Sequence, residues 1–183
     1  MQIDATQIDG VFVVEVEPIE DERGLFARTF GIDEFDAAGI DARVAQCSVS
    51  YNHAAATLRG MHFQNGPYGE TKLVRCIRGR IFDVAVDARS GSSTFGQWQA
   101  WELNESNRRA LLVPPGVAHG FITLAPRSEV FYQISVAYRE DASAGLRWDD
   151  PQIAIQWPMP PAVISERDRR LPMLADIVAQ PPA

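Results

Sequence analysis

Lys72 is the first residue that suggests chemistry, because it is the only lysine among the 17 basic residues of the chain. An ammonium and a guanidinium are not interchangeable, so a chain that otherwise uses arginine can need an ammonium here. The alternative is that one lysine has survived by chance. In a strand, Lys72 shares one face with Val74 and Cys76. If that face points inward, Lys72 lies in the interior or at its opening, where the charge must be paired or used. If Leu73 and Ile77 mark the inner face instead, Lys72 is solvated.

The three histidines offer a base or a metal site. His53 falls in a loop segment and is assigned no role. His119 closes the turn Pro114-Pro-Gly-Val-Ala-His, and a Pro-x-Gly-x-x-His turn that leads into a strand is a feature of cupin barrels. Metal-binding cupins add a His-x-His pair, whereas this chain reads His62-Phe-Gln. A three-ligand set of His62, Glu70 and His119 remains as an alternative.

Two tyrosines share a face with aliphatic residues in the segment 128–138. With a period of two, the inward residues are Val130, Tyr132, Ile134, Val136 and Tyr138. The simplest interpretation is a pair of core tyrosines whose hydroxyls find a partner.

Composition limits the class of protein that carries these residues. The 183 residues are 46% apolar and 22% charged, which excludes a disordered chain and a coiled coil. The net charge of −7 argues against a nucleic-acid partner, although a few local arginines can still bind a small anion. An acidic, polar N-terminus, no apolar run of about 20 residues and only two cysteines predict a cytoplasmic protein without a membrane partner.

The elements that must position the candidate residues are short strands separated by turns. Alternation predicts half-buried strands with Phe12, Val14 and Val16 on one face, and with Phe82, Val84 and Val86 on another. Further strands are expected at 25–30, 43–50, 58–63, 71–77, 97–103, 110–113, 119–125 and 128–138. Short helices are expected at 31–38 and within 164–178. We therefore expect one all-β domain over 1–183, with a barrel core at about 20–160 and a short helical segment at 161–183.

Several motifs, taken in order, resemble the dTDP-4-dehydrorhamnose 3,5-epimerase family, a non-metal branch of the cupins. The resemblance runs from about Glu20 to Asp168. Its pieces are Asp21-Glu-Arg-Gly-Leu-Phe, Cys47-Ser-Val-Ser, Thr57-Leu-Arg-Gly-Met-His-Phe-Gln, Lys72-Leu-Val-Arg-Cys-Ile-Arg-Gly, Pro115-Gly-Val-Ala-His-Gly-Phe, Tyr132 to Tyr138, Gly145-Leu-Arg-Trp-Asp-Asp-Pro with Ile155-Gln-Trp-Pro, and Ser165-Glu-Arg-Asp. It implies a cupin-like jelly-roll barrel with short peripheral helices, working as a homodimer with shared active sites.

The family's activity implies proton transfer on a nucleoside-diphosphate 4-keto-6-deoxy sugar, without metal or cofactor. The C4 ketone acidifies the hydrogens at C3 and C5, so a base forms an enolate and an acid returns a proton to the opposite face. The resemblance assigns the base to His62, its orienting carboxylate to Asp168, the enolate partner to Lys72 and the acid to Tyr132.

The resemblance also implies a set of binding residues, with some departures from the family pattern. It assigns pyrophosphate contacts to Arg59 and, from the partner subunit, Arg23. Active-site positions near the nucleotide or sugar match His119, Phe26 and Tyr138. The departures are Arg28, where the family usually has an acid, and the altered segment that contains Gln46 and Ser48. These departures leave open which nucleotide base and which sugar the substrate contains, and whether C3, C5 or both are inverted. A related ketoisomerase and a non-catalytic sugar-binding cupin are the alternatives.

Overall fold

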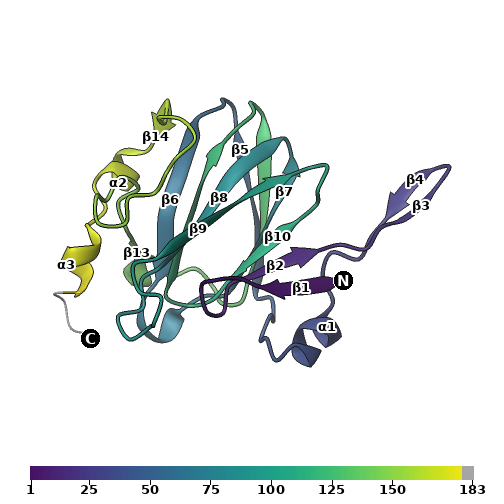
Figure 1. The fold of residues 1–183 in the computed structure, drawn as a ribbon, viewed down its shortest axis with the longest axis horizontal. Coiled ribbons are helices and arrows are strands. Elements are labelled where there is room, and N and C mark those ends of the chain that lie inside the picture. Colours follow the sequence, from purple (N-terminus) through teal and green to yellow (C-terminus); the bar gives the residue numbers. More distant parts are fainter. Residues whose placement is uncertain (179–183) are drawn as a thin grey trace.

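Two six-stranded β-sheets packed face to face dominate the computed structural model, which describes residues 1–178 (Figure 1). The first sheet has the order β1 (Gln2–Ala5), β2 (Phe12–Glu15), β10 (Ala110–Val113), β7 (Lys72–Arg78), β12 (Ser128–Ile134) and β5 (Gln46–Asn52). The second has the order β13 (Ser143–Gly145), β6 (Thr57–Gln64), β11 (Val117–Thr123), β8 (Arg80–Asp87) and β9 (Trp98–Asn104), and β14 (Val163–Ile164) pairs with β6 in parallel.

The space between the sheets is filled by side chains from both of them. Val74, Leu111 and Val130 of the first sheet and Ile81, Leu103 and Phe121 of the second belong to one fully buried cluster. Tyr132 packs against the same cluster, and Cys76 is part of it. Tyr132 therefore faces the interior, as the alternation over 128–138 predicted, and of the two positions left open for Lys72 the structure shows the interior one.

Strand β8 was predicted to be half-buried, but both of its faces are covered, including the one with Phe82, Val84 and Val86. These residues pack on the outer face of the second sheet, against Leu146, Ile153 and Trp157 of the chain's C-terminal part. The opposite face, which contains Asp83 and Ala85, lies between the sheets, and Asp83 is fully buried there. Periodicity marked two faces correctly but did not show that a later segment covers the apolar one.

The outer face of the first sheet is covered in part by the short helix α1 (Ile32–Ala37). Phe35 is fully buried against Val14, Leu73 and Leu112. The remaining helical segments are η1 (Gly66–Tyr68), η2 (Glu140–Ala142), α2 (Glu166–Arg169) and α3 (Leu174–Val178). α2 and α3 lie beside the second sheet, on the side away from α1 (Figure 1). The part of the predicted helical segment at 179–183 lies outside the described residues.

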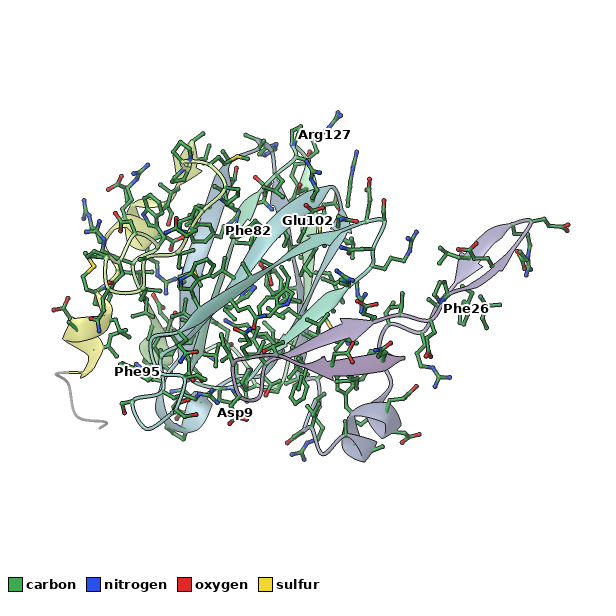
Figure 2. All side chains as sticks on the ribbon, in the orientation of Figure 1. Asp9, Phe26, Phe82, Phe95, Glu102 and Arg127 are labelled. Carbon is green, nitrogen blue, oxygen red and sulfur yellow. The ribbon has the colours of Figure 1, made fainter. Side chains whose placement is uncertain are left out.

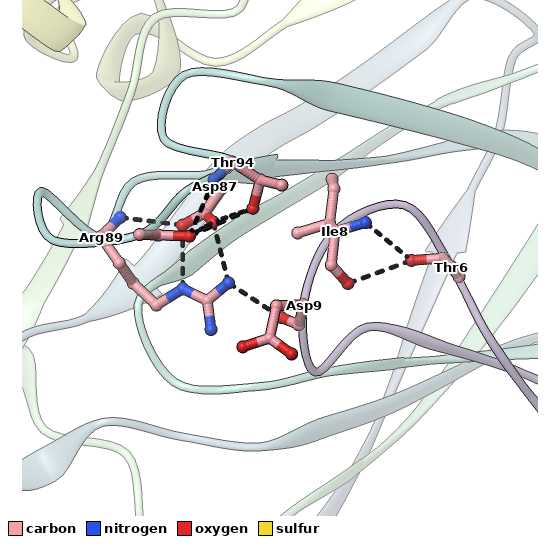
Figure 3. Close-up of polar contacts among 7 residues, drawn as sticks. Thr6, Ile8, Asp9, Asp87, Arg89 and Thr94 are labelled. Atoms are coloured by element: carbon pink, nitrogen blue, oxygen red, sulfur yellow. Dashed lines mark hydrogen bonds and ion pairs between the residues drawn. The ribbon is translucent and has the colours of Figure 1, made fainter.

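A buried carboxylate joins the β8–β9 connection to the N-terminal segment (Figure 3). Asp87 accepts hydrogen bonds from Arg89, Ser92 and Thr94 at 2.5–3.0 Å, and Arg89 Nη2 donates to the Asp9 carbonyl at 2.8 Å. Burial raises the pKa of Asp87, but these hydrogen bonds outweigh it and hold the pKa at about 2. All its partners are local, so we assign this cluster a structural role.

One hairpin projects from the body of the molecule. It consists of β3 (Ile19–Asp21) and β4 (Gly24–Phe26), which form a separate two-stranded sheet (Figure 1). Phe26 lies on this arm, away from the two packed sheets, and is 74% exposed (Figure 2). Ile19 is 72% exposed on the same arm. A hairpin with this much exposed apolar surface is typical of a contact site.

Several expectations change in detail. The described strands form two open sheets, and no pairing closes them into a barrel. Strand β12 ends at Ile134, so Tyr138 lies beyond it and is 55% exposed. The sheets also include β1 and β2, which precede the expected core at 20–160. Within residues 1–178, no helix is long and apolar enough to cross a membrane.

Candidate active site

A cleft of about 670 Å³ opens between the two sheets, and it collects most of the predicted site residues. The size is that of a pocket for a small organic ligand. Strands β5, β6, β7, β11 and β12 supply its walls, and the segment from β14 to α2 closes one side. Its charged and polar lining consists of Gln46, Ser48, Ser50, Thr57, Arg59, His62, Glu70, Lys72, His119, Tyr132, Tyr138, Ser165, Arg167 and Asp168.

An irregularity in β6 turns both Arg59 and His62 toward the cleft. In a regular strand, residues three apart point to opposite faces. Here His62 pairs with His119 but Arg59 pairs with Phe121, so β6 has one extra residue between these positions. Such a bulge re-aims a side chain. Gly60 lies within it at a φ of 139°, and a Cβ there would lie 2.5 Å from the Cα of Gly120, so the close approach requires glycine.

His62 forms a hydrogen-bonded pair with Asp168, 106 residues later in the chain, at 2.7 Å from Nε2 to Oδ1. The pairing of β14 with β6 brings α2 to this point, and the Ser165 hydroxyl caps α2 by accepting from the Asp168 amide. Burial raises the pKa of Asp168, but hydrogen bonds from His62, the Gly60 amide and the Ser165 side chain lower it below its usual value. An ionised carboxylate only accepts, so Nε2 carries the proton and Nδ1 is free to act as a base.

His119 forms a second pair, with Asp83, at 2.8 Å from Nε2 to Oδ1. His119 lies directly opposite His62 on the neighbouring strand, so both rings reach the same cleft. Asp83 is fully buried, and its Oδ2 finds no hydrogen-bond partner within residues 1–178. Burial raises the pKa of Asp83, and the charges of His119 and Lys72 oppose that shift. This pair is therefore more enclosed than the first.

Tyr132 reaches the cleft from the facing sheet. Its ring meets the His119 ring edge to face, with 6.2 Å between the centroids. Burial, with a further contribution from Asp83, raises the pKa of the phenol above its usual value. The hydroxyl therefore stays protonated at neutral pH and can serve as a proton donor.

The single lysine is buried at the cleft wall. Its Nζ lies 2.8 Å from Glu70 Oε1, and it donates to the backbone carbonyl of His62 at 3.1 Å. Its side chain is 9% exposed, so the solvated alternative for Lys72 is wrong. Glu70 is bound to Lys72 and Gln64, and no group of three metal-ligating side chains occurs in the described part of the chain.

Two arginines add positive charge to the cleft. Arg59 is held by a 2.8 Å hydrogen bond from Nε to Asn52 Oδ1, which leaves its terminal nitrogens free of that contact. Arg167 of α2 donates to the Ser143 hydroxyl at 2.5 Å. Arg167 was missed from the sequence, although it lies within Ser165-Glu-Arg-Asp, next to the predicted Asp168. Asp83 was also missed, because it read as the polar side of a half-buried strand.

Three predicted binding residues lie away from this cleft. Arg23 is exposed on the projecting hairpin and pairs with Asp21. Phe26 lies on the same hairpin, and Arg28 forms an exposed 3.0 Å ion pair with Glu34. Gln46, Ser48 and Tyr138, in contrast, line the cleft. None of these three residues lines the cleft of its own chain.

Known proteins resemble the chain over nearly its whole length. The family model for dTDP-4-dehydrorhamnose 3,5-epimerase matches residues 5–176. A dTDP-4-dehydrorhamnose 3,5-epimerase from Methanothermobacter thermautotrophicus is 43% identical over 168 residues, which cover 90% of this chain and 89% of that protein. A dTDP-4-dehydrorhamnose 3-epimerase from Streptomyces niveus is 35% identical over 177 residues, covering 96% of this chain and 85% of that one.

A solved structure shares the fold described above. The crystal structure of dTDP-4-dehydrorhamnose 3,5-epimerase from Bacillus anthracis, with TDP and PPi bound, is 38% identical and superposes with a TM-score of 0.91. The match covers 94% of this chain and 98% of that one. The likeness in sequence and the likeness in fold thus each extend over most of the chain. This chain belongs to the dTDP-4-dehydrorhamnose 3,5-epimerase family of isomerases.

Proposed function

We propose that the chain epimerises a dTDP-linked 4-keto-6-deoxy sugar at C3 and C5. The observation that carries the proposal is the arrangement of one base and one acid on opposite walls. His62, oriented by Asp168, lies on the second sheet, whereas Tyr132 lies on the first. A sugar ring held between the sheets then has a base on one face and an acid on the other, which is what inversion at carbon requires.

The proposed step moves one proton at a time. His62 Nδ1 takes the hydrogen from C5 or C3, the C–H electron pair forms the C=C bond of an enolate, and the negative charge moves to the C4 oxygen. Lys72 donates a hydrogen bond to that oxygen, and its compact ammonium group is suited to stabilise the negative charge there. Tyr132 then gives its proton to the same carbon from the opposite face, and the ketone re-forms. Solvent returns a proton to the phenolate and removes one from the imidazolium.

The cationic residues suit the nucleotide part of the substrate. Arg59 and Arg167 lie on the cleft wall of a chain whose net charge is −7, so the positive charge is local. Guanidinium groups bind phosphate oxygens in a bidentate manner. We assign the diphosphate to these two arginines, together with Arg23 from a second copy. We place His119, Gln46, Ser48 and Tyr138 beside the sugar or the base.

We propose a cupin-type jelly roll that works as a homodimer. Support comes from exposed apolar side chains on the outer face of the first sheet, where Val49, Tyr51 and Ile77 are 61%, 40% and 45% exposed. The projecting hairpin adds Ile19 and Phe26. A second copy seated on this face would cover these residues and would bring Arg23, Phe26 and Arg28 toward the other cleft.

Inversion at C3 alone is the second candidate. The relative from Streptomyces niveus, 35% identical to this chain, is a 3-epimerase, so membership of the family does not determine which carbon is inverted. Both outcomes need the same base, acid and oxyanion partner.

Proton exchange tests the proposal. The chain is incubated in D₂O with dTDP-4-keto-6-deoxyglucose, and C3 and C5 are followed by NMR. Deuterium at both carbons with new configurations is expected. Deuterium at C3 alone would assign the chain to the mono-epimerases, and no exchange at either carbon would overturn the proposal. His62→Ala serves as the control, since exchange should depend on the base.

A further inference from the structure

Glu70 is a charged residue at the cleft to which the mechanism above gives no task. Its carboxylate is buried, with a side-chain exposure of 9% that equals that of Lys72. Its Oε1 lies 2.8 Å from Lys72 Nζ, and its Oε2 accepts from Gln64 Nε2 at 3.2 Å. Both carboxylate oxygens therefore have a polar partner, one on β7 and the other on β6.

The contacts of Lys72 leave one donor for a ligand. A lysine ammonium has three N–H groups arranged tetrahedrally. One is directed to Glu70 Oε1, and a second is donated to the backbone carbonyl of His62. With two directions occupied, the third N–H is fixed in space, and Lys72 lines the cleft. Without Glu70, the flexible side chain would lose one of the two contacts that set this direction.

Glu70 also connects the two sheets at the site. Lys72 lies on β7 of the first sheet, whereas Gln64 lies on β6 of the second, two residues after His62. The carboxylate between them joins the strand of the base to the strand of the lysine. Gln64 Oε1 in turn accepts from the Arg139 amide at 2.7 Å, and Arg139 follows the cleft residue Tyr138. Glu70 and Gln64 together thus connect three parts of the cleft wall.

We propose that Glu70 is a positioning residue that holds Lys72 with a single N–H directed at the substrate's C4 oxygen. The role that it gives to Lys72 rests on the proposed function, whereas the immobilisation of Lys72 does not. In this role Glu70 acts through Lys72 and not on the substrate itself. It acts by keeping the ammonium at a set distance from the base, and misplacement of an oxyanion donor by about 1 Å can lower a rate about 100-fold.

The single lysine allows a direct test of immobilisation. Protein labelled with ¹⁵N at the lysine Nζ gives one side-chain ammonium signal, which comes from Lys72. In the wild type we expect this signal to be protected from hydrogen exchange. Glu70→Gln should raise the exchange rate about tenfold or more. Glu15→Gln is the matched control, because Glu15 forms an exposed ion pair with Arg109, away from the cleft. An exchange rate unchanged in Glu70→Gln would overturn the proposal.

Kinetics test whether Glu70 acts through Lys72. Glu70→Gln should lower kcat about tenfold and leave KM within about threefold, since the donor acts on the enolate. In a Lys72→Met background the same change should alter kcat by less than about twofold, because coupled residues are non-additive. An equal loss in both backgrounds, or a loss confined to KM, would overturn the positioning role. Glu70→Asp keeps the charge that folding needs, and we expect an intermediate kcat.

The two measurements separate this proposal from the proposed function. If the wild type does not exchange C3 or C5 hydrogens, the proposed function fails, and the ammonium signal alone decides whether Glu70 immobilises Lys72. If the wild type is active, and Glu70→Gln and Glu70→Asp match it in kcat and in the exchange of the ammonium signal, the function stands and the role of Glu70 is wrong.

Discussion

The cleft contains two histidine–aspartate pairs, side by side on neighbouring strands, with opposite environments. In the first, the His62 side chain is 35% exposed, and Asp168 accepts hydrogen bonds from His62 and from the Gly60 amide. In the second, the His119 side chain is 5% exposed, and one oxygen of Asp83 has no partner in the described structure. The distances within the pairs, 2.7 and 2.8 Å, are nearly equal.

From this difference we infer that the surroundings of each pair, more than its own geometry, set its proposed chemistry. Hydrogen bonds lower the pKa of Asp168 in spite of burial, so this carboxylate stays charged and keeps His62 in the tautomer of a base. Burial raises the pKa of Asp83, which favours the neutral form of its carboxyl. A neutral carboxyl needs no charged partner. We therefore assign proton abstraction to the first pair and a binding role to the second.

The largest effect is expected when each histidine is removed in turn. His62→Ala should lower kcat about 10³-fold or more, because it removes the proposed general base. His119→Ala should raise KM and preserve most of the deuterium exchange at C3 and C5. Steady-state kinetics and exchange in D₂O measure both variants, with circular dichroism as a check of folding. If His119→Ala loses exchange as completely as His62→Ala, the assignment of roles is wrong.

Lys72 is the residue that contacts the first pair and influences the second. Its Nζ binds the His62 carbonyl, and its charge opposes the raised pKa of Asp83. Lys72→Arg keeps the charge, but the planar guanidinium cannot reproduce the ammonium's position. We expect kcat to fall about 100-fold, the loss typical of one oxyanion donor. A rate within threefold of the wild type would mean that the single lysine is accidental.

Replacing Tyr132, on the opposite wall of the cleft, tests the comparison without changing either histidine–aspartate pair. Tyr132→Phe removes the proposed acid but leaves the His62–Asp168 pair intact. Deuterium exchange next to the ketone should persist, while inversion at one carbon or both should slow about 100-fold. NMR distinguishes the two, since retained configuration with deuterium marks return of the proton from the original face. Fully inverted product at the normal rate would assign the acid to another group.

The smallest expected effect is a difference in how stability depends on pH. The folded pKa of Asp168 is below its usual value of 3.8, so its contribution is present above about pH 4 and is lost as pH falls through the folded pKa. The folded pKa of Asp83 is above 3.8, so its contribution is present below that value and is lost as pH rises through the folded pKa.

The two asparagine variants should therefore respond to pH with opposite signs. Relative to the wild type, Asp168→Asn should lose unfolding free energy as the pH rises to about 4, whereas Asp83→Asn should gain it as the pH rises above about 4. Urea unfolding at each pH measures both. Slopes of the same sign would contradict the contrast between the pairs.

Much of the strand pattern was predictable from the sequence. Alternation places Tyr132 on an interior face but leaves two positions open for Lys72, and turn residues separate strands within a few residues of their ends. The family resemblance rests on short motifs that include His62, Asp168 and Arg59. The arm that carries Arg23 could also be expected to serve a second copy, which stays a prediction.

What the sequence determined by itself is local, because hydrophobic periodicity and turn chemistry act over a few residues. The tertiary structure decided the rest. Only the register of β6 against β11 shows the extra residue that turns Arg59 and His62 to one side. Only sheet packing shows that Asp83 faces the interior and that Glu70 joins Lys72 to Gln64 across the two sheets. A polar residue on an alternating strand reads as solvent-facing, and its burial depends on the sheet that packs against that face, which local patterning does not reveal.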